Sequence, residues 1–323
     1  MNKHKKIKFS IAIPTYNGAD KLELNLKRFV NECNHKKFKD FFELNISDNC
    51  STDNTKQIIN KYIKILSKKN FVKINYFRTK KNEGYYKNLL NVLKISKGEY
   101  ITFLADRGIP EKGLYNEIFQ FFKKKNLNGL GIIPLKNETK YIKKMFSIDE
   151  LALVVTRGSM LSGVVLKRKK ISLKYIKSNI YAHNIIYINY YLKYGFEKLS
   201  FKKSIQTIYD QTVEEKFRDR VCRKIDFAVL DKIESVDLFY RKNKINFIFF
   251  LITISKIYLW CIEIKLLLKK EGHEKLSNNF FKETLKYKNK KIILLAFIMI
   301  IFKYFFTKKI FFILNSFSLL IIN

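Results

Sequence analysis

A strand-like run that ends in two charged residues is the first place in this sequence where chemistry is expected. Residues 100–104 are almost wholly apolar, a short helical pattern precedes them, and Asp106 and Arg107 follow. This order is typical of a buried strand in a parallel sheet. Ligands of such sheets bind beyond the carboxyl ends of the strands. We therefore expect Asp106 and Arg107 to lie at a ligand site.

A second polar run follows an earlier predicted strand at residues 42–47. Residues 48–53, with the sequence DNCSTD, are small and polar, which suits a turn and a helix N-cap. Capping of the next helix is the simplest role for the two acids of this run. That role fits Asp53 better than Asp48.

The elements that position these residues alternate along the first 135 residues. Apolar runs separated by amphipathic helical patterns indicate βαβ units and a parallel, doubly wound sheet. Strands are predicted at residues 8–14, 42–47, 71–77, 100–104 and 129–135, and helices at about 19–33, 57–65, 85–97 and 111–124. Further along, residues 151–167 predict a broken strand, 178–194 a helix and 204–220 a polar linker.

The last third of the chain changes to long apolar runs with interspersed lysines, at residues 247–268, 292–306 and 310–322. The last two are shorter than the roughly 20 residues of a spanning helix. Such segments suit an anionic membrane surface, with lysines reaching the head groups. A helical hairpin packed on the first domain or on a second subunit fits equally well. We expect one domain over residues 1–220 and a helical region over 221–323.

The net charge of +36 would suit a nucleic acid, an anionic membrane or a polyanionic substrate. Lysines spread over the whole chain without a recognisable nucleic-acid module, which disfavours a nucleic-acid partner. Part of the excess matches the lysine-rich composition of an AT-rich genome. The four scattered cysteines predict free thiols in a reducing compartment. The basic start leads directly into a strand, so we expect no signal peptide and a cytoplasmic location.

Four pieces of the sequence, taken in order, resemble the inverting family 2 glycosyltransferases with a GT-A fold. The resemblance implies a doubly wound mixed α/β sheet, here with a helical, basic and apolar C-terminal extension. The likeness covers about residues 8–200, and the interval from Gly84 to Asn88 looks most like an abequosyltransferase-like bacterial subgroup. The pieces are Ile13-Pro14-Thr15-Tyr16-Asn17, Ser47-Asp48-Asn49-x-Ser51-Thr52-Asp53, Asn82-x-Gly84-x-x-x-Asn88, and Gly98-Glu99-Tyr100-Ile101 leading into Leu104.

The resemblance implies a nucleotide-sugar donor whose base, a pyrimidine, is held by the first two pieces. Asp48 would accept the ring N–H of the base. Glycine in the third piece would let the backbone approach the ribose and diphosphate closely. The implied nucleotide contacts are Pro14, Thr15, Tyr16, Asn17, Asp48, Asn82, Gly84 and Asn88.

The chain departs from the family pattern at the corner where an acidic pair holds a divalent cation. Here Asp106 is the one carboxylate, and Arg107 stands where another acid is expected. Mg²⁺ or Mn²⁺ bound through Asp106 and the substrate phosphates is not excluded. The adjacent guanidinium disfavours a cation and suits bidentate phosphate binding. We therefore expect Arg107 to contact the diphosphate.

A general base for the acceptor hydroxyl is the remaining requirement of an inverting transferase. The family commonly places an acid at the start of the helix that here carries His183. A histidine has a suitable ordinary pKa, and Asp149 and Glu150 are the alternatives. Small residues at 158–163 resemble the segment that lines the sugar side of the cleft, although a strand with a glycine bulge fits them as well.

These features together predict a hexosyltransferase-type, inverting family 2 enzyme. It would add a sugar to a lipid-linked acceptor in bacterial polysaccharide or lipopolysaccharide synthesis, at the inner face of the cytoplasmic membrane. The alternative is a catalytically degenerate GT-A scaffold in a membrane-associated glycan assembly complex.

Overall fold

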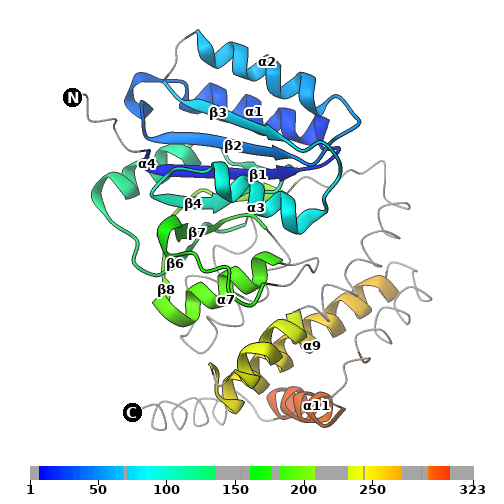
Figure 1. The fold of residues 1–323 in the computed structure, drawn as a ribbon. Helices are drawn as coiled ribbons and strands as arrows, with labels where there is room; N and C mark the ends of the chain where they lie inside the picture. Colours follow the sequence, from blue (N-terminus) through cyan, green and yellow to red (C-terminus); the bar gives the residue numbers. More distant parts are fainter. Residues whose placement is uncertain are drawn as a thin grey trace. The chain divides into compact units, whose positions relative to one another are not determined.

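The computed structural model describes residues 7–68, 71–135, 154, 161–176, 182–207, 232–242, 244–270, 285 and 290–305 (Figure 1). By its internal contacts the chain divides into two compact units. The first contains residues 1–145 and 160–211, and the second contains residues 146–159 and 212–323.

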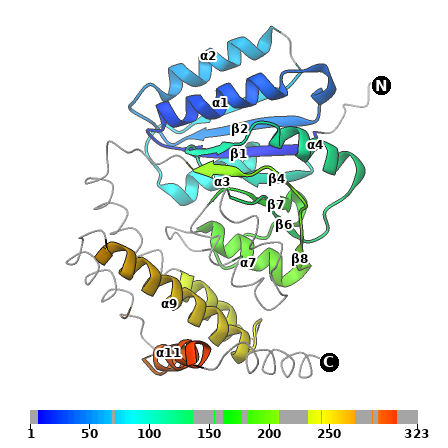
Figure 2. The ribbon, with the colours of Figure 1, turned by 180° about the vertical axis from the view of Figure 1, so that it is seen from behind.

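A seven-stranded mixed sheet forms the centre of the first unit, in the order β3-β2-β1-β4-β7-β6-β8 (Figures 1 and 2). The first four strands in the chain are parallel, and β7 enters antiparallel between β4 and β6. This confirms the predicted mixed α/β sheet. The strands are β1 (Phe9–Thr15), β2 (Phe42–Asp48), β3 (Lys73–Arg78), β4 (Tyr100–Phe103), β6 (Leu130–Ile132), β7 (Val164–Lys167) and β8 (Phe196–Glu197).

Helices cover both faces of this sheet. Apolar residues of α1, α2 and α4 form one core with Phe9, Ile11 and Ile13, which alternate along β1 and so share a face. Helix α3 packs against β1, β2 and β3 through the buried Leu89 and Val92, outside that core. The helices are α1 (Ala19–Cys33), α2 (Thr55–Ser67), α3 (Tyr85–Ile95), α4 (Leu114–Lys124) and α7 (Ala182–Tyr194).

A small second sheet was not predicted. β5 (Gly108–Pro110) follows Asp106 and Arg107 directly and pairs antiparallel with β9 (Ile205–Thr207). The prediction of a polar linker is therefore wrong at its start, because Ile205 is buried opposite Pro110. Of the broken strand predicted at residues 151–167, the part from 164 onward is β7, and most of the rest lies outside the described residues.

The second unit is helical in the residues that the structure describes. A helical stretch at residues 232–241 precedes α9 (Phe247–Lys270) and α11 (Lys290–Phe305). α9 and α11 pack together, with the rings of Tyr258 and Phe297 5.5 Å apart. Within the described ranges, no helix combines the length and the apolar character needed to cross a bilayer. The predicted apolar run at 310–322 lies outside these ranges.

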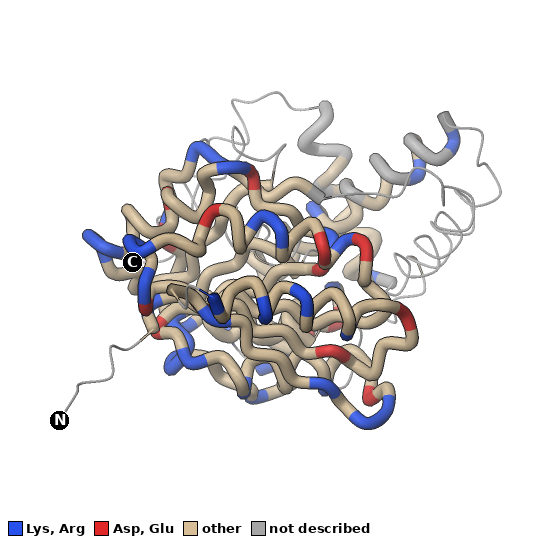
Figure 3. Tube along the Cα trace, turned by 90° about the horizontal axis from the view of Figure 1, so that it is seen from above, with Lys and Arg blue, Asp and Glu red and all other residues tan. Residues whose placement is uncertain are grey.

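Lysines and arginines are scattered along the described trace of the chain (Figure 3). They occur on helices, strands and loops alike, with acidic residues between them (Figure 3). The large positive charge is therefore not gathered on a single element of the described part.

Candidate active site

Asp106 lies just beyond the end of β4, next to the end of the parallel strand β1. Thr15, the last residue of β1, donates a hydrogen bond from Oγ1 to Asp106 Oδ2 at 3.1 Å. Asn25 of α1 donates from Nδ2 to the Asp106 carbonyl oxygen at 2.5 Å. A Cβ atom on Gly18 would lie 2.5 Å from Asp106 Oδ2 and 2.6 Å from Thr15 Oγ1. The position of this carboxylate is therefore set by β1 and the start of α1.

The surroundings of Asp106 change its electrostatics. The residue is half-buried, yet neighbouring atoms keep water from its carboxyl group, and this desolvation raises the pKa of Asp106 above its ordinary value. The Thr15 hydrogen bond and the Arg107 charge oppose that rise. The predicted pair is thus a poorly hydrated carboxylate followed by a half-buried guanidinium.

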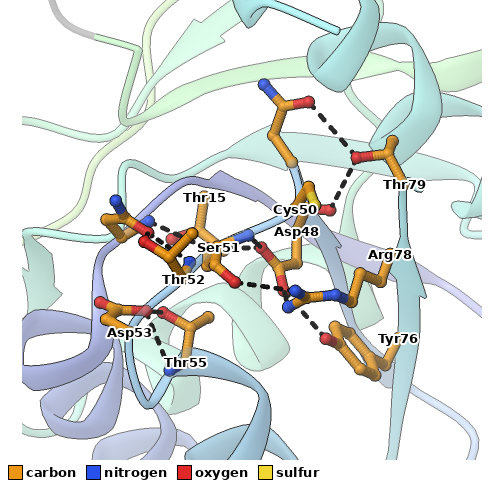
Figure 4. A network of polar contacts seen from close by, with 12 residues as sticks. Thr15, Asp48, Cys50, Ser51, Thr52, Asp53, Thr55, Tyr76, Arg78 and Thr79 are labelled. Carbon is orange, nitrogen blue, oxygen red and sulfur yellow. Dashed lines mark hydrogen bonds and ion pairs between the residues drawn. The ribbon is translucent and has the colours of Figure 1, made fainter. Parts of the chain in front are cut away.

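Asp48, at the end of β2, is fully buried in a network of polar contacts (Figure 4). Its Oδ1 accepts hydrogen bonds from the backbone N–H of Ser51 at 2.8 Å and from the Ser51 hydroxyl. Its Oδ2 accepts from Arg78 Nη1 at 2.6 Å and from Tyr76 Oη at 3.0 Å. Both oxygens already have partners within the chain, so a nucleotide base at Asp48 would have to share them. The predicted base contact stays a prediction.

Arg78 and Tyr76 were missed by sequence reasoning, although both lie on the predicted third strand. Arg78 also donates from Nη2 to the Ser51 carbonyl oxygen at 2.7 Å, and thereby fixes the loop after β2. Burial, followed by the contact with Asp48, raises the pKa of Tyr76 to about 12. Alternation along β3 could have indicated that residues 76 and 78 share one face.

Asp53 accepts hydrogen bonds at the helix start, as predicted, although the N-cap residue of α2 is Asn54. Asp53 Oδ1 accepts from the backbone N–H of Thr55 at 3.0 Å at the start of α2, and its Oδ2 accepts from the N–H of Ala19 at 3.1 Å at the start of α1. Desolvation opposes ionisation of this carboxyl, but the hydrogen bonds from Thr55 and Ala19 outweigh it and lower the pKa of Asp53. One carboxylate therefore joins the starts of two helices.

The loops after β1 and β2 hold each other in shape. Asn17 Oδ1 accepts from the N–H of Thr52 at 2.8 Å, and the N–H of Asn17 donates to Ser51 Oγ at 2.9 Å. Asn17 has φ of 52° and Cys50 has φ of 62°, a left-handed conformation that is uncommon outside glycine. The side chain of the predicted contact Tyr16 is 46% exposed here, whereas Pro14 is buried within β1.

The Asn82–Asn88 segment joins the same edge of the sheet. Asn82 Oδ1 accepts from Asn49 Nδ2 at 2.6 Å and from the N–H of Gly84 at 2.9 Å. Gly84 has φ of 83°, which favours glycine, and α3 begins at the next residue. The buried Asn88 donates from Nδ2 to the Thr15 carbonyl oxygen at 3.1 Å. Thr15 therefore connects Asn88 to Asp106.

His183 lies in α7 and is only 2% exposed. Its Nδ1 is 2.9 Å from the hydroxyl oxygen of Tyr85, the first residue of α3. Sequence reasoning missed Tyr85, although its place directly after Gly84 could have drawn attention to it. The alternative bases Asp149 and Glu150 lie outside the described residues.

The predicted small-residue segment at 158–163 is described from residue 161 onward. Ser162 Oγ accepts a hydrogen bond from the N–H of Ala105 at 3.0 Å. This part of the segment therefore borders the Asp106 corner.

A metal at this edge would depend on few ligands from the chain. Among the described residues, no group of three or more His, Cys, Asp and Glu side chains could hold an ion. Asp106 would supply one carboxylate, with the remaining ligands coming from water and from a bound diphosphate. The described residues thus form no dedicated metal cage, and a role for Mg²⁺ or Mn²⁺ stays a prediction.

Comparison with known proteins agrees with this geometry. Residues 10–145 match the family model described as Glycosyl transferase family 2. The poly(ribitol-phosphate) beta-N-acetylglucosaminyltransferase TarS of Staphylococcus aureus is 30% identical over 138 residues, which is 39% of this chain and 22% of TarS. Dolichyl-phosphate beta-glucosyltransferase of Dictyostelium discoideum is 28% identical over 130 residues, 39% of each protein. The chain thus spans about a fifth of TarS and two fifths of the Dictyostelium enzyme.

The fold is shared with solved structures. The fragment of S. aureus TarS spanning residues 1–349 gives a TM-score of 0.51 at 17% identity, covering 88% of this chain and 93% of that chain. The same fragment in complex with UDP gives a TM-score of 0.50 at 16% identity. The chain has a GT-A fold, and its residues 10–145 match the model of family 2 glycosyltransferases. The abequosyltransferase-like subgroup stays a prediction.

Proposed function

We propose that this chain is an inverting, hexosyl-type glycosyltransferase that uses a nucleotide-diphosphate sugar. The observation that carries the proposal is the position of Thr15, which hydrogen-bonds both Asp106 and Asn88. Three family motifs that are far apart in the sequence thereby meet at the carboxyl ends of β1 and β4. Ligands of open α/β sheets bind at this edge.

The donor would bind along the loops of this edge. Its base would lie against the exposed Tyr16 and near the Asp48 network, where Arg78 and Tyr76 hold the carboxylate in place. A pyrimidine base is supported by the complex of the TarS fragment with UDP. The diphosphate would lie at Gly84, Asp106 and Arg107, where the guanidinium can bind two phosphate oxygens at once.

Transfer would occur by a single displacement at the anomeric carbon. The acceptor oxygen would form its bond to that carbon as the bond to the diphosphate breaks, and the electron pair would leave with the phosphate. Inversion is in keeping with the beta-linked products in the names of both curated relatives.

A lipid-linked glycan is the proposed acceptor, in bacterial surface polysaccharide synthesis at the inner face of the cytoplasmic membrane. The name of the Dictyostelium relative includes a lipid phosphate. In α11, Leu294, Leu295 and Ile298 are exposed and follow the exposed Lys291 at helical spacing, so they lie along one stripe. An apolar stripe beside lysine suits the head-group region of an anionic leaflet.

Binding and transfer assays test the proposed activity. The purified full-length chain is titrated with UDP-, CDP- and dTDP-sugars, each with Mg²⁺, with Mn²⁺ and with excess EDTA. We expect one pyrimidine donor to bind, and transfer to persist in EDTA but to be lost in Arg107→Ala. Strict metal dependence would contradict the direct diphosphate contact of Arg107, and failure of every donor to bind would contradict the activity.

Vesicle sedimentation tests the membrane surface separately. We expect the full-length chain to pellet with anionic vesicles and not with neutral ones, and the triple variant Leu294→Ser, Leu295→Ser, Ile298→Ser to remain in the supernatant. A matched triple change of the exposed Lys36, Lys56 and Lys80 in the first unit to Ser controls for charge alone. Equal pelleting of wild type and the stripe variant would contradict the proposed surface.

A degenerate scaffold is the second candidate, because the predicted metal corner contains Asp106 as its single acid. The two candidates differ in turnover. A scaffold could bind a nucleotide sugar but would neither transfer nor hydrolyse it.

A further inference from the structure

Tyr85 connects the loop that ends at Gly84 with the buried His183. Its hydroxyl oxygen lies 2.9 Å from His183 Nδ1, although the two residues are 98 positions apart in the sequence. The two rings meet edge to face with centroids 5.7 Å apart. This contact joins α3 to α7, the helix in which the family is expected to carry its base.

His183 is poorly placed to meet an acceptor directly. Only 2% of its surface is exposed, and its ring also lies edge to face with that of Tyr187. Tyr187 is fixed in turn by a hydrogen bond from its hydroxyl to the Leu161 carbonyl oxygen at 2.9 Å. A general base must come within hydrogen-bond reach of the proton that it removes, directly or through one intervening group. Tyr85 is half-buried and can provide that intervening group.

Tyr85 is also close to the other candidate residues of the site. It lies three positions before Asn88 in α3, and residues at this spacing share a helix face. Asn88 donates to the Thr15 carbonyl oxygen, and Thr15 donates to Asp106, each at 3.1 Å. Helix spacing and two hydrogen bonds therefore relate Tyr85 to the corner proposed for the diphosphate.

We infer that Tyr85 relays the acceptor proton to His183. The inference rests on the proposed transferase activity. The acceptor O–H bond breaks as its proton moves to Tyr85 Oη, and the original phenol proton moves to His183 Nδ1. His183 becomes an imidazolium, and the acceptor oxygen bonds to the anomeric carbon as the nucleotide diphosphate leaves with the electron pair.

The acid–base properties of the two side chains suit these two roles, with Tyr85 passing the proton on and His183 accepting it. An ordinary tyrosine, with a pKa of about 10, holds its proton too tightly to be an efficient base when alone at neutral pH. An ordinary histidine titrates close to neutrality and can accept the proton. In this relay Tyr85 contacts the acceptor, and His183 accepts the proton.

The experiment compares Tyr85→Phe with wild type in steady-state transfer assays. The neighbouring half-buried Tyr86 provides the matched control, Tyr86→Phe. Removal of a general acid–base group typically costs 10²–10⁴-fold in rate. We expect kcat of Tyr85→Phe to fall about a hundredfold with the donor KM unchanged, and Tyr86→Phe to stay near wild type.

A double-variant cycle with His183→Asn separates a relay from two structural roles. If the residues act as one unit, the double variant is about as slow as each single variant. If the losses of the two single variants simply add in the double variant, the relay is overturned. It is also overturned if wild type is active and Tyr85→Phe is equally active. A wild type that binds donor but transfers no sugar overturns the proposed function and the relay together. Since Tyr85→Phe removes only a hydroxyl, its result stands even if His183→Asn fails to fold.

Discussion

Two buried carboxylates near opposite ends of β2 show how the two edges of the sheet differ. Glu43, near the amino end, accepts hydrogen bonds from Ser10 Oγ, Asn75 Nδ2 and the backbone N–H groups of Lys97 and Gly98. All four donors are uncharged, and they tie together β1, β2, β3 and the turn before β4. Asp48, at the carboxyl end, is paired with the Arg78 guanidinium.

The surroundings of the two acids explain this difference. The amino edge is closed by short contacts among buried groups, and Gly98 would place a Cβ atom 2.5 Å from Ser10 Oγ. The carboxyl edge has partly exposed arginines at 78 and 107 and the exposed Tyr16. We infer that the amino edge mainly stabilises the fold, whereas the carboxyl edge is the one proposed to bind the donor.

Removing the Glu43 carboxylate should have the largest effect on stability. Glu43→Ala removes the acceptor of four hydrogen bonds, two of which come from the buried Ser10 and Gly98, and a buried group left without a partner costs about 1–3 kcal/mol. We expect a loss of about 3 kcal/mol or more in the free energy of unfolding of the first unit, measured by urea denaturation. The control Glu23→Gln removes a surface pair with Lys61 and should cost under about 1 kcal/mol.

The paired variants Gly18→Ala and Gly98→Ala compare the two edges directly. Each adds a methyl group 2.5 Å from a side-chain oxygen, Asp106 Oδ2 in the first case and Ser10 Oγ in the second. We expect Gly18→Ala to reduce transfer at least tenfold by displacing Asp106, at a cost of about 1–3 kcal/mol in stability. Gly98→Ala should destabilise more, because the Ser10 backbone N is 2.6 Å away, while the folded fraction still binds donor. Equal activity losses in the folded fractions would contradict the separation of roles.

The pH dependence of stability should differ between Asp106 and Asp53. Desolvation raises the pKa of Asp106, so its ionisation destabilises the fold as pH rises through the folded-state pKa. Asp106→Asn should therefore have a higher Tm than wild type at pH 7, with the difference shrinking on acidification below the ordinary pKa of about 4.

The effect of Asp53 on stability should change with pH in the opposite direction. Desolvation opposes ionisation of this carboxyl, but hydrogen bonding from Thr55 and Ala19 outweighs it and lowers the pKa. The ionised carboxylate therefore stabilises the fold at pH 7, and this stabilisation is lost as pH falls through the folded-state pKa. Asp53→Asn should lower Tm at pH 7 and matter less in acid. Thermal scans at pH 7 and in steps down to pH 3 test both signs.

Among these substitutions near the site, Tyr76→Phe should have the smallest effect on stability and on donor binding. It removes one of the hydrogen bonds to Asp48 and leaves the Arg78 pair in place. We expect a loss of about 1 kcal/mol in the free energy of unfolding. Calorimetric titration with the donor should show a change of less than tenfold in Kd, and a larger change would assign Tyr76 a direct role in binding.

Much of the fold could be predicted because its signals are local. Alternating apolar runs and helical periodicity identified β1 to β4 and β6, and the position of Asp106 after β4 followed from strand direction alone. The short strands β5 and β9 were missed, because they pair with each other across about a hundred residues of sequence.

The amino-acid sequence by itself determined which side chains reach the carboxyl edge of the sheet, because strand direction and helix spacing follow from neighbouring residues. Only the tertiary structure decided what those side chains contact. Asp48 meets Arg78 from the adjacent strand, and His183 meets Tyr85 across 98 positions. The physical reason is that hydrogen-bond geometry is set by how helices and loops pack across the sheet, and no local pattern encodes that packing.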